Sequence, residues 1–255
     1  MAEARPGSRR ASTLSIAALV VANISALLLL AAPLGAGFHL WDFGRGFDLM
    51  RWAVYASGLA LVLALGGIVW GLARSNRSSV MLSAAALALA VVIGGIPLFQ
   101  YRTARIVPPI NDITTDMESP PDFVAAGRGA ENGAAGAPYP GQEFADAQSA
   151  AYPDVRTLDL PQSPDEVFRA ALEVARGMPG WEVVLADSSA GRIEGTATTR
   201  WFRFKDDVVV RIQPGASGTR VDIRSRSRVG QSDVGANAAR IRAFTARLKE
   251  RLGPA

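Results

Sequence analysis

Three arginines alternate with small residues near the end of the chain and could bind an anion. In the stretch 222–228, DIRSRSR, every second residue of a strand would point to the same face. Arginine forks fit phosphate or carboxylate, and the backbone N–H groups at a helix start favour negative charge. We therefore predict a candidate anion-binding site where this strand leads into the final helix. Its residues are Arg224, Arg226, Arg228, Ser232 and Arg240.

The acidic side chains of the same region offer an internal explanation for these arginines. Residues 101–191 carry 6 basic and 14 acidic side chains, and residues 192–255 carry 14 and 6, so a net −8 faces a net +8. The candidate acidic partners on nearby strands are Glu194, Asp206 and Asp207. Asp233 can likewise cap the final helix itself. Internal pairing and ligand binding both stay open as hypotheses.

The scarcity of cysteine and histidine excludes several kinds of catalytic and metal site. It has no cysteine, and its one histidine, His39, lies between the first two apolar runs. This excludes thiolate nucleophiles, Cys-ligated metals and Ser-His-Asp hydrolysis in the C-terminal region. Asp112, Asp116 and Glu118 could attract a hard cation, but they form no complete ligand loop and fit local turn hydrogen bonds better. We expect no metal and no cofactor.

Three apolar runs in the first hundred residues are long enough to cross a bilayer. Thr13–Ala32, Trp52–Ala73 and Ser79–Phe99 each reach the necessary length of about 20 residues without a charged side chain. A core helix of a soluble protein would carry a polar stripe, which these runs lack. We predict a three-helix transmembrane region over residues 13–100, with the lipid bilayer as partner and a cytoplasmic tail over residues 1–12.

The arginines that flank these runs predict the orientation of the helices across the membrane. On one side lie Arg5, Arg9, Arg10, Arg74 and Arg77, and on the other Arg45, Arg51, Arg102 and Arg105. Flanking Lys and Arg favour the cytoplasmic side. We therefore expect a multi-pass protein of the inner or plasma membrane, with its N-terminus in the cytoplasm and its C-terminal domain outside. The loop Phe38–Phe47 has the aromatic composition of an interfacial belt.

The rest of the chain divides into an arm and a domain of mixed α and β structure. Residues 101–153 are rich in Pro, Gly and Ala, which is typical of an arm or linker. Residues 154–255 show the order β-α-β-β-β-β-α, with helices expected at 164–178 and 232–252. The expected strands are Val155–Leu160, Trp181–Ala186, Arg192–Phe204, Val208–Gln213 and Arg220–Val229. Short turns between successive strands predict an α+β domain, with one antiparallel sheet and both helices on one face.

Several short motifs of this region are similar to those of a known family. They are Asp112–Asp116 (DITTD), Ala151–Asp154 (AYPD), Gly180-Trp181, Arg192–Glu194 (RIE), Phe204 with Asp206-Asp207 and Arg211, and the runs Asp222–Gly230 and Ser232–Ile241. Over residues 106–252 the chain resembles the domain of unknown function 1499 family. The resemblance implies no known reaction, ligand or catalytic residue.

These observations together predict a membrane-anchored protein with a non-enzymatic binding or assembly domain. The expected partners are an anionic lipid headgroup, an envelope polymer or a membrane protein. A nucleic-acid partner is not expected, because residues 101–255 carry 20 basic and 20 acidic side chains and so no net charge. The alternative is a carboxylate-based hydrolase of the cell envelope that works through Glu194 and Asp207, since carboxylates can serve as general acids and bases.

Overall fold

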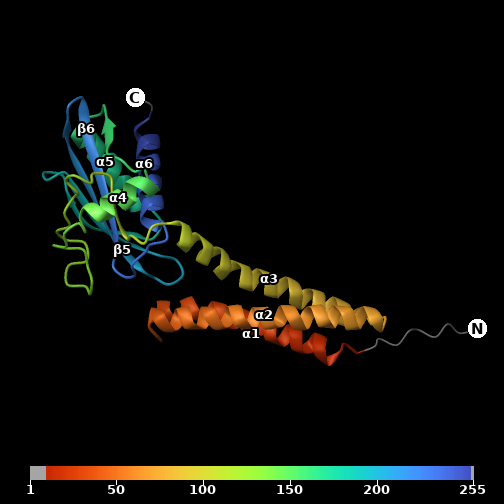
Figure 1. The fold of residues 1–255 in the computed structure, drawn as a ribbon. Coiled ribbons are helices and arrows are strands. Elements are labelled where there is room, and N and C mark those ends of the chain that lie inside the picture. The colour runs from red at the N-terminus through yellow and green to blue at the C-terminus, as the bar shows by residue number, and fades with distance from the viewer. Residues whose placement is uncertain (1–9, 254–255) are drawn as a thin grey trace, which may run out of the picture. The chain divides into compact units, whose positions relative to one another are not determined.

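The computed structural model describes residues 10–253, and the chain falls into two compact units (Figure 1). The first unit ends at Arg102 and the second begins at Thr103. Most of the predicted cytoplasmic tail, with Arg5 and Arg9, lies outside the described residues.

The first unit consists of three long helices: α1 (Thr13–Gly37), α2 (Phe43–Ala73) and α3 (Arg77–Ile106), whose last turn reaches into the second unit. Each is long and apolar enough to cross a membrane, as the sequence predicted. The predicted loop Phe38–Phe47 is wrong in its extent, because α2 already begins at Phe43. The carboxylate of Asp42 accepts a hydrogen bond from the backbone N–H of Arg45 at 3.1 Å and caps this helix start.

Small residues line the surfaces along which these helices meet. The buried positions of α2 follow a spacing of four and three residues: Ala53, Ser57, Ala60, Ala64, Gly67 and Gly71. Ala18, Ala22, Ala86 and Ala90 of α1 and α3 pack against them. The Ser57 hydroxyl donates to the carbonyl oxygen of Ala90 at 2.6 Å. Lipid tails are as apolar as large side chains, so close packing of small residues and such hydrogen bonds hold membrane helices together.

The second unit is built on a six-stranded antiparallel sheet in the order β1-β6-β5-β4-β3, with β2 paired to β6 beside β1. The strands are β1 (Asp112–Thr114), β2 (Leu158–Leu160), β3 (Trp181–Asp187), β4 (Arg192–Thr198), β5 (Lys205–Gly215) and β6 (Gly218–Ser227). The helices are α4 (Gln142–Ala151), α5 (Pro164–Gly177) and α6 (Ala236–Leu252). The predicted α+β domain with an antiparallel sheet is confirmed.

Helices α5 and α6 share one core with the sheet. Val167 and Ala171 of α5, Phe244 of α6, and Val208 and Ile223 of the strands are buried in this core. Helix α5 begins where the sequence predicts: Ser163 caps it, and Pro164 occupies its first turn, where no backbone N–H is needed. The apolar stripe of each helix therefore covers the same face of the sheet.

Several predicted boundaries need correction. Strand β2 has three residues in place of six, and β4 ends at Thr198, so residues 199–204 form a loop and not the end of a strand. The final helix begins at Ala236 and not at Ser232, because Gly235 adopts a left-handed conformation with φ of 83°. The segment expected as an arm contributes β1 and α4 to the second unit.

Candidate functional site

The sheet face opposite α5 and α6 carries most of the charged side chains that the sequence singled out. Side chains alternate between the two faces along each strand. While Val208, Val210 and Ile223 enter the helix-side core, the side chains of Glu194, Asp207 and Arg224 point the other way. We call this side the charged face, and the chain that lies on it, residues 115–141, the covering segment.

Arg224 lies at the centre of the charged face and has no exposed side-chain surface. Its Nε and Nη2 donate to the two carboxylate oxygens of Asp112 at 2.9 and 2.8 Å, and its Nη1 donates to the carbonyl oxygen of Pro121 at 3.1 Å. The rings of Phe123 and Tyr139 lie 5.0 and 5.5 Å from the guanidinium carbon. This arginine is therefore desolvated, but it is neutralised by β1 and flanked by aromatic rings of the covering segment.

Glu194 fixes the covering segment through the backbone. Its buried carboxylate accepts hydrogen bonds from the N–H groups of Val124, Ala125 and Ala126 at 2.7 to 2.9 Å. Arg192 donates to the same carboxylate at 3.0 Å. Three converging N–H groups are the arrangement by which protein backbone holds an anion, and here the anion is a side chain of the protein itself.

Asp207 makes a second anchor for the covering segment. Its carboxylate accepts from the backbone N–H of Ala134 at 3.0 Å and from the hydroxyl of Thr196 at 2.9 Å. Arg228 binds the same carboxylate with Nε and Nη2 at 2.9 and 2.6 Å. The bidentate geometry leaves this carboxylate no free oxygen on which a catalytic proton transfer could begin.

Two further arginines and two aspartates form a network near the start of the covering segment. Arg211 donates to both Asp116 and Asp222 at 2.9 Å, and Arg220 donates to the same pair at 2.7 and 3.0 Å. Burial alone would raise the pKa of Asp222, but hydrogen bonds from Thr157, Arg211 and Arg220 outweigh it and hold the pKa below its usual range. Asp116 also accepts from the N–H of Ser119 at 3.0 Å, a local turn of the kind expected for it.

Three polar groups of the charged face have no hydrogen-bond partner within residues 10–253: the Tyr139 hydroxyl, Nη1 of Arg226 and Nε of Arg211. Burial, together with the neighbouring Asp112 charge, raises the pKa of Tyr139 to about 12, and Arg224 offsets this only in part. The Arg226 side chain is 28% exposed, and its Nε lies 3.8 Å from Asp112. Of the three alternating arginines, Arg226 thus has the weakest contacts with carboxylates.

Ser232 and Arg240 are not part of the charged face. Arg240 reaches Asp206 and the Ser225 hydroxyl, both of which face the helix side. The Ser232 hydroxyl accepts from the N–H of Val234 at 3.2 Å. Asp233 occupies the start of α6: its two carboxylate oxygens accept from the N–H groups of Gly235 and Asn237 at 2.7 and 2.9 Å. Burial raises the pKa of Asp233, although these two hydrogen bonds oppose the rise.

The structure therefore divides the predicted anion-binding residues between two faces of the sheet. Arg224, Arg226 and Arg228 lie together on the charged face, whereas Arg240 lies on the other side with Asp206. Asp207 pairs with Arg228, whereas Glu194 pairs with Arg192 on its own strand. Anion binding by these residues stays a prediction.

Sequence reasoning missed the covering segment and the aromatic residues that enclose Arg224. Residues 115–141 have no regular periodicity, so no pattern marks Phe123 or Tyr139 as partners of Arg224. The available signal was charge: the acidic region contains Asp112 and Asp116, which pair with arginines more than 90 residues later in the chain.

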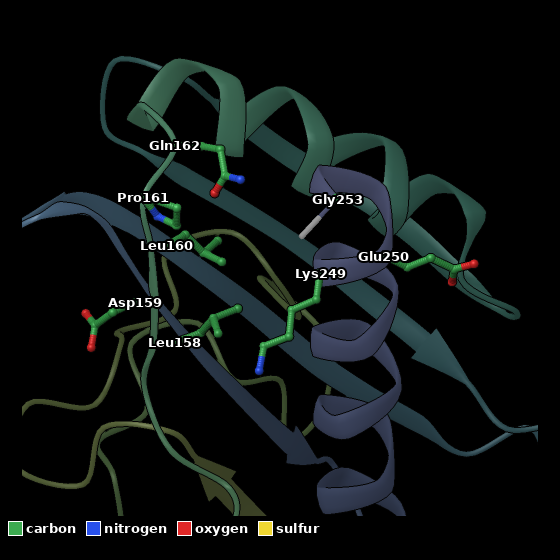
Figure 2. Close-up of a pocket in the computed structure, with 8 residues that line it drawn as sticks. All are labelled: Leu158, Asp159, Leu160, Pro161, Gln162, Lys249, Glu250 and Gly253. Atoms are coloured by element: carbon green, nitrogen blue, oxygen red, sulfur yellow. The ribbon is translucent and has the colours of Figure 1, made fainter. Parts of the chain in front are cut away.

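A cavity of the second unit lies away from the charged face, between β2 and the end of α6 (Figure 2). It encloses about 470 Å³ and has Leu158, Leu160 and Pro161 on its walls. Figure 2 shows Lys249 extending from α6 toward Leu158, while Glu250 points away from the cavity. The polar residues Asp159, Gln162, Lys249 and Glu250 complete the lining.

Comparison with known proteins identifies a family whose function is unknown. Residues 112–248 match the family model described as a protein of unknown function, DUF1499. No curated protein matches the chain, and no solved structure does. The matched region begins at β1 and includes the covering segment and the sheet with both of its helices.

Proposed function

Because the chain belongs to this family of proteins of unknown function (DUF1499), we propose its role from geometry: a non-enzymatic binding or assembly domain that three helices hold at a membrane surface. The membrane anchorage rests on the three apolar helices. The binding role rests on the domain itself.

The observation that carries this proposal is the engagement of the buried carboxylates. Glu194 accepts from three backbone N–H groups and Arg192, and Asp207 accepts from Ala134, Thr196 and Arg228. A general acid or base must reach a substrate proton, and both carboxylates lie at 0% side-chain exposure beneath the covering segment. This arrangement favours an ordered surface over a hydrolytic centre.

The proposed binding partner carries an anionic group that contacts Arg226. This side chain keeps an unsatisfied Nη1 and is partly exposed, whereas Arg224 and Arg228 are already held by carboxylates. The exposed part of this side chain can meet a phosphate or carboxylate, whose geometry suits an arginine fork. A lipid headgroup or an envelope polymer carries such a group.

Purification of the full chain in mild detergent tests this proposal. Wild type, Arg226→Gln and the matched surface variant Arg169→Gln would be compared by native mass spectrometry for retained lipids and proteins. We expect an anionic molecule that wild type and Arg169→Gln retain and that Arg226→Gln loses at least several-fold. Equal recovery by all three proteins would contradict the proposal. Ester or glycoside turnover that disappears in Glu194→Gln would instead favour the hydrolase.

We also propose that the second unit lies outside the cytoplasm, in a protein of the inner or plasma membrane. The support is the distribution of flanking arginines, with Arg74 and Arg77 between the second and third helices on the N-terminal side. A reporter fused after Ala255 that is active only in the cytoplasm should be silent. An active reporter would reverse the orientation.

A further inference from the structure

The loop between β4 and β5 combines an exposed tryptophan with three cationic side chains. In Thr199–Lys205, TRWFRFK, Arg200, Arg203 and Lys205 are exposed, and Trp201 exposes 59% of its surface. The segment contains no acidic residue. We call residues 199–205 the basic aromatic loop. A large exposed aromatic side chain among cations is unusual on a surface that meets only water.

The basic aromatic loop is held in a fixed form. The N–H of Thr199 donates to the carbonyl oxygen of Phe204 at 2.8 Å, and the N–H of Phe204 donates to the Thr199 hydroxyl at 2.8 Å. The rings of Phe202 and Phe204 stack at 5.2 Å. The Arg200 guanidinium carbon lies 5.5 Å from the Trp201 ring. Trp201 is thus presented by an ordered scaffold, which lowers the entropy lost on binding.

The loop lies at the end of the sheet where the chain arrives from α3. The N–H of Arg228, just after β6, donates to the carbonyl oxygen of Lys205 at 3.1 Å. One residue earlier, the N–H of Ser227 donates to the carbonyl oxygen of Asn111 at 2.9 Å. Helix α3 ends at Ile106, so only residues 107–110 separate it from Asn111. At about 3.5 Å per residue this connection is a short tether, and the loop belongs to the tethered end of the second unit.

We propose that the basic aromatic loop docks the second unit onto an anionic lipid bilayer. Trp201 would enter the headgroup region, where amphipathic indole rings concentrate, and Arg200, Arg203 and Lys205 would meet lipid phosphates. This site uses different residues from the one proposed around Arg226, although both lie toward the same end of β5 and β6. It does not depend on the ligand proposed for Arg226.

Photo-crosslinking of the full chain in nanodiscs tests the docking. Discs would contain photoreactive phosphatidylglycerol or photoreactive phosphatidylcholine, and lipid adducts would be mapped by mass spectrometry. We expect adducts on residues 199–205 with phosphatidylglycerol, at least fivefold above those on the turn at residues 215–218 at the other end of β5. Adducts on the three membrane helices report that the photoreaction worked in every sample.

Charge variants complete the test. Arg200→Gln/Arg203→Gln/Lys205→Gln should lose most of the loop adducts, and 0.5 M salt should lower them in wild type because exposed charges are screened. A control removes three charges from the helices instead, in Arg169→Gln/Lys249→Gln/Arg251→Gln, and should keep the adducts. Loop adducts no higher than those of residues 215–218, or equal with both lipids and in both triple variants, would overturn the proposal. A loop that crosslinks only to an added membrane protein would also overturn it.

Discussion

Arg224 and Asp112 form a bidentate ion pair with no exposed side-chain surface, and they join two segments that lie 112 residues apart in the chain. The pair ties β1 to β6 on the charged face. Desolvating two charges is costly, and their mutual attraction with further hydrogen bonds offsets that cost only when both are present. Removing either side chain would therefore leave the other charge buried without a counter-ion.

This relationship predicts a strong coupling between the two side chains. Asp112→Ala should lower the free energy of unfolding by about 3–5 kcal/mol, because it leaves a buried guanidinium without a counter-ion. Arg224→Met should have a similar cost, and the double variant should cost clearly less than the sum. Thermal unfolding of the full chain in detergent would be measured for wild type, the two single variants and the double variant. Additive costs would show that the two charges act independently.

Tyr139 gives the domain a specific dependence on alkaline pH. Its pKa is raised to about 12 in the folded chain and is near 10 when unfolded, so the folded state favours the neutral phenol. The resulting stabilisation is complete below pH 10 and is lost as the pH rises toward 12. Tyr139→Phe should remove this part of the decline. At pH 7 the variant should be nearly as stable as wild type, because its hydroxyl has no hydrogen-bond partner within the described chain.

Unfolding midpoints of wild type and Tyr139→Phe, measured from pH 8 to 12, isolate the contribution of this phenol. Other groups that titrate in this range are common to both proteins and cancel in the difference. Parallel curves would mean that the phenol ionises as easily in the folded chain as in the unfolded one.

The membrane helices allow a matched pair of glycine substitutions. A Cβ on Gly67 would lie 2.2 Å from the Ser83 hydroxyl, whereas a Cβ on Gly58 would meet nothing within 4 Å. Gly67→Leu should therefore separate the packed helices and cost about 1–3 kcal/mol. Gly58→Leu, on an exposed surface of the same helix, should be neutral or stabilising. Thermal melting in detergent compares them, and equal melting temperatures would refute the small-residue packing.

The strongly periodic parts of the fold could be predicted from sequence. Apolar length reveals the membrane helices, and Ser163 with Pro164 marks the start of α5, because these signals act within a few residues. Alternation along β6 also places Arg224, Arg226 and Arg228 on a common face.

The covering segment could not be predicted in the same way. Its order comes from contacts with distant side chains: Glu194 binds Ala126 across 68 residues, and Asp207 binds Ala134 across 73. β1 has only three residues, too few to show an alternating pattern. The charge imbalance indicated that acids would meet arginines, but it could not indicate that Asp206 and Asp207 would pair on opposite faces of the sheet.

The central claim is that the charged face is closed by its own covering segment. Hydrogen exchange of the full chain tests this most directly, at the backbone N–H groups of Val124, Ala125 and Ala126 that donate to Glu194. They should exchange orders of magnitude more slowly than an exposed loop, and Glu194→Ala should release them while Glu182→Ala, on the exposed side of β3, does not. Exchange of these three amides in wild type at the rate of an exposed loop would contradict the account.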